Sequence, residues 1–131
     1  HLYARRQRQM CIRDRVVLSA ILHLAFMVLE MFFWGFVAGK LLGLEGEAIE
    51  KTAMLGFNQG AYNGFIAVGL LVTFMGVFSV SQGFAVRMVL LASAAAAGLI
   101  GWVTVGGSAF FIVQMALPAL ALVLTYLTRE E

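Results

Sequence analysis

The side chains that could do chemistry lie inside long apolar stretches of this chain. The first stretch carries two ionisable residues, His23 and Glu30, and Trp34 follows Glu30 by four positions. Residues seven apart share one face of a helix, as do residues four apart. An ionisable group within a membrane helix is costly, usually faces the protein interior and marks a functional site by default. Glu30 is therefore the candidate catalytic residue, as an acid or base or as a hydrogen-bond partner for a ligand.

Amide and phenol side chains gather in the next apolar stretch, over residues 58–64, and Gln114 adds another amide in the last stretch. Counted at helical rise from the side that holds the 40–52 loop, Glu30 and Asn63 both lie ~14 Å deep. Gln114 lies at a similar depth. We therefore predict one intramembrane pocket, in which Glu30, Asn58 and Asn63 line a cavity and Gln59, Tyr62 and Gln114 form its wall. The full set of predicted pocket residues is His23, Glu30, Trp34, Asn58, Gln59, Tyr62, Asn63 and Gln114.

Each of these residues also has an ordinary structural interpretation. Asn and Gln in membrane helices often bond a neighbouring helix, at about 0.6 kcal/mol each. Tyr62 and Trp34 are typical anchors at the membrane interface. His23 has no second soft ligand in reach, which favours an interhelical hydrogen bond over a metal site. We therefore expect no metal and no cofactor.

Residues 1–15 do not resemble protein sequence. Positions 5–14, Arg-Arg-Gln-Arg-Gln-Met-Cys-Ile-Arg-Asp, match ten codons of the transposon-end adapter used in sequencing libraries, and Arg15 fits the adapter's last bases. We interpret 1–15 as adapter-derived and expect it to be disordered or a loose helical extension. On this interpretation the native N-terminal residues have been lost.

Removing this segment changes the charge of the chain. The sequence holds 9 Lys+Arg and 7 Asp+Glu, a net charge of +2. Five of the basic residues and one acidic residue lie in 1–15, which leaves 4 − 6 = −2. The basic balance that would suggest a nucleic-acid partner disappears, and no nucleic acid is expected. The single cysteine, Cys11, also lies there, so disulfides and thiol chemistry have no native residue to use.

The remaining residues predict a single all-α domain, 16–131, which is an integral membrane four-helix bundle of up-down-up-down topology. About 20 apolar residues cross a hydrocarbon layer of ~30 Å, and four segments have that length. Their predicted helices cover about 16–39, 54–80, 87–105 and 109–128. A soluble core is the alternative, but it would require polar helix faces. The 40–52 loop suggests a short interfacial helix, and the small residues of the third helix predict that it is the most enclosed.

Several blocks of residues resemble a known family. These are His23, Leu29-Glu30-Met31-Phe32-x-Trp34, Asn58-Gln59-Gly60-x-Tyr62-Asn63-Gly64-Phe65, and Phe111-x-x-Gln114 with Pro118-Ala119. They resemble the small bacterial membrane proteins grouped as domain of unknown function 1304, over nearly all of 16–131. The resemblance implies a multi-pass protein of the bacterial plasma (inner) membrane. It implies no reaction.

Three classes of function stay open, and the sequence does not decide whether the protein is an enzyme. The first is a membrane enzyme or binder of a lipophilic small molecule. The second is a proton-coupled exporter similar to the small multidrug transporters, which would make the protein a homo-oligomer. The basic residues give little orientation bias, because Lys40 and Lys51 on one side of the membrane would balance Arg87 and Arg129 on the other. The third is a structural or assembly subunit. The lipid bilayer is a partner in all three, and no nucleotide loop or catalytic triad pattern is present.

Overall fold

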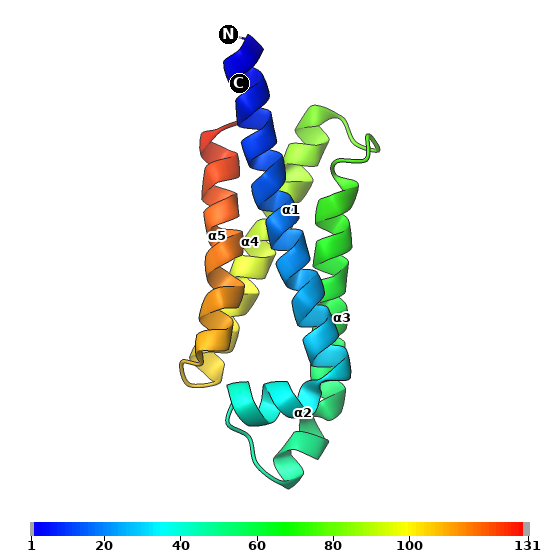
Figure 1. The fold of residues 1–131 in the computed structure, drawn as a ribbon, viewed down its shortest axis with the longest axis vertical. Helices are drawn as coiled ribbons and strands as arrows, with labels where there is room; N and C mark the ends of the chain where they lie inside the picture. Colours follow the sequence, from blue (N-terminus) through cyan, green and yellow to red (C-terminus); the bar gives the residue numbers. More distant parts are fainter. Residues whose placement is uncertain (1, 130–131) are drawn as a thin grey trace.

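The structure, a computed structural model, describes residues 2–129 and is helical throughout its regular elements. The elements in order are α1 (Leu2–Phe32), α2 (Trp34–Phe36), the π-helix η1 (Val37–Leu41), α3 (Glu47–Val72), α4 (Val80–Thr104) and α5 (Ala109–Leu127). In Figure 1 the long helices α1, α3, α4 and α5 run lengthwise, and α2 with η1 crosses one end. The start of α1 and the end of α5 lie at the opposite end. The all-α prediction is confirmed.

Three of the four long helices, α1, α4 and α5, are long and apolar enough to cross a membrane. The fourth, α3, has 26 residues and is long enough at helical rise. Its composition falls short because Asn58, Gln59 and Asn63 interrupt the apolar stretch. Membrane-spanning character was predicted for four segments, and within residues 2–129 it is found for three.

The first predicted helix, 16–39, is wrong at its C-terminal end. Helix α1 ends at Phe32, and Phe33 leaves the helical region with φ −127° and ψ 34°. This turn allows the Trp34 indole to donate from Nε1 to Thr52 Oγ1 over 3.1 Å. The segment is held at its far end as well, where Ser108 Oγ donates to the Leu41 carbonyl over 2.9 Å. These contacts with distant residues fix the bend, so an uninterrupted apolar run did not reveal it.

Among the other predicted boundaries, the largest differences are at both ends of the second helix and at the start of the third. Helix α3 covers Glu47–Val72 rather than 54–80, and acidic residues in its first turn suit the positive end of the helix dipole. The segment that crosses one end of the bundle is therefore α2 with η1. The prediction of a short interfacial helix within 40–52 is wrong. Helix α4 begins at Val80 rather than 87, because Ser79 and Gln82 form a capping box. Helix α5 ends one residue before the predicted 128.

A stripe of glycines lets α3 approach α1 closely. Gly56, Gly60 and Gly64 recur every four residues, all are buried, and each lies under a side chain of the α1–α2 segment. A Cβ added at Gly60 would lie 2.6 Å from Met31 Cγ and 3.0 Å from the Met27 carbonyl oxygen. Such spacing of small residues is a common way for helices to pack in lipid. The stripe therefore sets the distance across which α1 and α3 exchange polar contacts.

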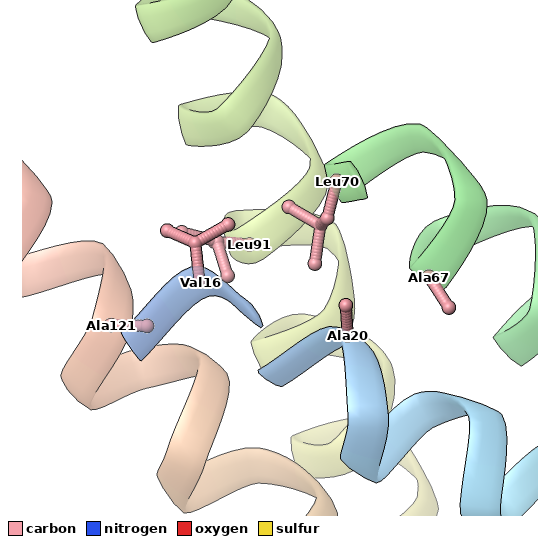
Figure 2. Close-up of a cluster of buried hydrophobic side chains, with 6 residues drawn as sticks. All are labelled: Val16, Ala20, Ala67, Leu70, Leu91 and Ala121. Atoms are coloured by element: carbon pink, nitrogen blue, oxygen red, sulfur yellow. The ribbon is translucent and has the colours of Figure 1, made fainter. Parts of the chain in front are cut away.

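The apolar core joins all four long helices. Figure 2 shows its buried members, which are Val16, Ala20, Ala67, Leu70, Leu91 and Ala121. Residues 2–15 continue α1 as a helix, one of the two forms expected for that segment. Among their described side chains only Ile12 and Arg15 are part-buried, and Ile12 packs against this core.

Helix α4 is not the most enclosed helix, contrary to the prediction from its small residues. Ala92, Ser93 and Ala96 are exposed on its outer face. Its close contact is with α5, where a Cβ added at Gly98 would lie 2.7 Å from the backbone nitrogen of Met115. Helix α1 instead packs against both α3 and α5. The small residues of α4 thus allow close packing against α5 on one face, and those on the opposite face are exposed.

Candidate functional site

Three buried polar side chains from three helices form a hydrogen-bonded chain. Asn63 on α3 donates from Nδ2 to Glu30 Oε2 on α1 over 2.6 Å. Gln114 on α5 donates from Nε2 to Asn63 Oδ1 over 3.2 Å. All three residues are 2% exposed. The structure thus brings together three residues for which the sequence predicted a common depth.

Local sequence explains why these three side chains meet. Asn63 directly precedes Gly64 of the glycine stripe, so the close approach of α3 to α1 carries its amide to Glu30. Asn63 Nδ2 also lies 3.3 Å from the carbonyl oxygen of Gln59, one turn earlier, which fixes its orientation. Pro118 lies four residues after Gln114 inside α5, and a proline there has no N–H to offer the Gln114 carbonyl.

A cleft of about 420 Å³ lies beside Glu30. It is bounded by the end of α1, the α2–η1 segment, α3, the end of α4 and the start of α5. Its polar lining residues are Glu30, Trp34, Gln59 and Thr104, and its apolar ones are Val37, Leu42, Leu55, Ala97, Ile100, Gly101, Val105, Phe110 and Phe111. The cleft is thus open and mainly apolar, and Glu30 is the only residue with a carboxyl group in its wall.

Glu30 lines the cleft, and one oxygen of its carboxyl group, Oε2, is held by Asn63. Asn63 is the only hydrogen-bond donor that the described part of the chain provides to it. An ionised carboxyl group has about four acceptor positions, so most of its hydrogen-bonding capacity is unused by the protein. Asn63 and Gln114 do not line the cleft, and they support Glu30 from behind.

Two predicted pocket residues, Asn58 and Tyr62, lie elsewhere. Both are exposed on the outer face of α3, and Tyr62 is 61% exposed. Successive residues of a helix are rotated by about 100°, which places Tyr62 about 100° and Asn58 about 140° away from Asn63. The prediction that Asn58 lines the cavity and that Tyr62 forms part of its wall is therefore corrected. Shared depth does not imply a shared face.

His23 is also separate from the cleft, although it is fully buried. Its Nδ1 donates to the Ser19 carbonyl oxygen over 2.8 Å, and its ring meets Phe26 edge-on at 6.2 Å. Within residues 2–129, His23 Nε2 and Gln114 Oε1 are buried without a hydrogen-bond partner. No three His, Cys, Asp or Glu side chains of the same residues gather as metal ligands would.

Trp34 and Gln59 do line the cleft, as predicted, and the sequence interpretation missed several of their neighbours. Phe110 and Phe111 belong to the first turn of α5, which Ser108 caps by accepting from the Phe110 N–H. Val37 lies in the π-helix. A helix cap followed by two aromatic residues, at the same end of the bundle as Trp34, is the signal that could have identified the pair.

These features define an all-α protein with several helices apolar enough to cross a membrane and a polar chain in its interior. The model of the family described as "Protein of unknown function (DUF1304)" matches residues 17–126, and the chain belongs to this family. The resemblance stated from the residues is confirmed. No curated protein and no solved structure matches the chain.

Proposed function

We propose that this chain is a multi-pass protein of the bacterial inner membrane, and that the cleft beside Glu30 binds a lipophilic small molecule. The observation that carries the proposal is the position of Glu30. Its carboxyl group borders an apolar cleft and is fixed by a buried amide chain. A buried ionisable group in a membrane helix marks function by default, and an amide chain behind it supplies the rigid support that a binding site needs.

The outer surface supports the proposal that the chain inserts in the membrane as a four-helix up-down-up-down bundle. Beyond the three apolar helices, α3 carries exposed Phe57, Phe65 and Val68 while its Asn63 is buried. An outer surface of large apolar side chains suits lipid contact, and buried polar groups suit an interior shielded from it. On this proposal α3 is the fourth span, and all four helices belong to one domain, 16–131.

The proposed domain boundary is supported by the family match, which begins at residue 17, just after the adapter-like segment. Residues 2–15 have few part-buried side chains. They extend α1 beyond the bundle and do not line the site. We therefore propose that 1–15 contributes nothing to function.

The cleft has the size and the wall chemistry of a small-molecule site. Such sites measure roughly 300–1,000 Å³ and combine a mainly apolar lining with a few polar groups that orient the ligand. In this cleft Glu30, Gln59 and Thr104 supply the polar groups, and Trp34 and Phe111 supply flat apolar contact. Glu30 would contact the ligand directly, whereas Asn63 and Gln114 would position Glu30.

Carbene labelling tests the proposed site. The apolar reagent trifluoromethyl-phenyl-diazirine, photolysed with the purified protein, should label Val37 and Phe111 in the cleft as well as lipid-facing residues. The variant Ala97→Phe places a bulky ring in the cleft wall and should abolish label at Val37 and Phe111. The matched variant Ala96→Phe adds the same ring to the exposed face of α4 and should leave cleft labelling unchanged.

The response to competitors completes the test. A ligand site should saturate, so unlabelled small apolar molecules should suppress label in the cleft and leave the outer face unaffected. Cleft labelling that never saturates, or that responds equally to both Phe variants, would contradict a binding site there.

A further inference from the structure

We propose that the ligand of the Glu30 cleft is an organic cation, a protonated amine or quaternary ammonium group on an apolar body. This inference rests on the proposed function and adds the charge of the ligand. Its basis is that a carboxyl group, aromatic rings and an absence of cationic side chains coincide in the lining of the cleft.

The ionisable groups of the site are of one kind. Glu30 is the only acidic or basic side chain among the lining residues, and within the described chain it has no ion pair. The two lysines of the chain do not supply one. Lys40 is exposed and does not line the cleft, and Lys51 pairs with Glu47 at 3.2 Å on the outside of α3. The protein therefore leaves the compensating charge to be provided by something else.

The hydrogen bonds around Glu30 also indicate that its carboxyl group needs a further partner. Asn63 donates to one oxygen from behind, and the other acceptor positions receive no donor from residues 2–129. A buried carboxylate is stable when it is both paired and hydrogen-bonded, and it is costly when it is neither. A protonated amine in the cleft would supply both the opposite charge and a hydrogen-bond donor, and a quaternary ammonium group would supply the opposite charge. An anion would meet an uncompensated carboxylate and be rejected.

The rings in the cleft wall provide a second attraction for positive charge. Trp34, Phe110 and Phe111 all line the cleft beside Glu30. The indole nitrogen of Trp34 is occupied by Thr52, which fixes the indole in place. A cation near the face of an aromatic ring is attracted by its quadrupole, most strongly when water is excluded. A carboxyl group with fixed rings therefore favours a cation over a neutral molecule of the same shape.

A set of three probes with one shape separates charge from apolar fit. Benzyltrimethylammonium, its neutral carbon isostere neopentylbenzene and the anion benzylsulfonate compete against carbene labelling of Val37 and Phe111 in the wild-type protein. The cation should suppress label at a concentration lower by about tenfold or more than the neutral isostere. Benzylsulfonate should not compete at any concentration at which the cation saturates.

Two charge variants assign the preference to the site. Glu30→Gln keeps an acceptor for the Asn63 amide and removes the charge, so the preference for the cation over its neutral isostere should fall to the smaller part that the aromatic rings supply. Glu50→Gln removes an exposed charge from the first turn of α3 and should preserve the preference. Thermal unfolding shows whether each variant is folded, and the wild-type probe series decides the question without them.

The outcomes distinguish the two proposals. If neopentylbenzene competes as well as or better than benzyltrimethylammonium in the wild type, the ligand is not a cation, while the apolar binding site stands. If the preference for the cation is undiminished in Glu30→Gln, it does not depend on the carboxyl group of this cleft and the inference fails. If none of the three probes saturates the cleft, the proposed function itself fails.

Discussion

Replacing Asn63 by Ala removes the central member of the buried amide chain. The Asn63 side chain donates to Glu30 over 2.6 Å and accepts from Gln114 over 3.2 Å, and all three residues are 2% exposed. Alanine in its place leaves Glu30 without its donor and Gln114 without its acceptor. We expect Asn63→Ala to be among the most destabilising single changes on α3.

The size of the effect follows from the two hydrogen bonds. A hydrogen bond to a charged group contributes about 1.5–3 kcal/mol, and a neutral one about 1 kcal/mol. Measured couplings between membrane helices average about 0.6 kcal/mol, which lowers the sum. We therefore expect a loss of about 2–3 kcal/mol, which is a change of about 30-fold or more in the unfolding equilibrium constant.

Asn58→Ala is the matched control, because Asn58 lies on the same helix and is exposed. Both substitutions change helix propensity equally, so the difference between them isolates the buried chain. Unfolding of the two variants by increasing fractions of dodecyl sulfate in mixed micelles measures that difference. Equal unfolding midpoints for Asn63→Ala and Asn58→Ala would refute the reasoning.

Three further changes probe the rest of the molecule. Gly60→Ala should be less stable than Gly35→Ala by about 1–3 kcal/mol in the same assay, because a methyl group at Gly60 meets α1 whereas Gly35 faces open space. Equal stabilities of the two variants would contradict the role of the glycine stripe in packing α3 against α1. Reporter fusions at Thr52 and Glu131 should report opposite sides of the membrane, and mixed signals at both would instead support dual topology and the exporter alternative. Deleting 1–15 behind a new Met should cost no more than about 1 kcal/mol, the contribution of one part-buried Ile, and a larger loss of thermal stability would show that the segment belongs to the fold.

The local sequence determined the helical class, the number of long helices and part of their boundaries. Long apolar runs can satisfy their backbone groups in lipid only as helices, so this conclusion needs no tertiary information. The turn at residues 106–108 and the start of α5 follow from two glycines with positive φ and the Ser108 cap. The common depth of Glu30, Asn63 and Gln114 follows from simple counting along helices.

Tertiary packing decided which face of each helix points inward. In a soluble helix the apolar stripe marks the core, but these helices are apolar on both their outward-facing and their interior sides, so the pattern carries little directional information. Asn58 and Asn63 therefore looked equivalent in sequence, and only the fit of the glycine stripe against α1 buries one and exposes the other. The bend at Phe33 has the same origin, because the bonds that hold it join Trp34 to Thr52 and Leu41 to Ser108, residues far apart in the chain. Without that bend the cleft beside Glu30 would lack Trp34 and Val37 in its wall.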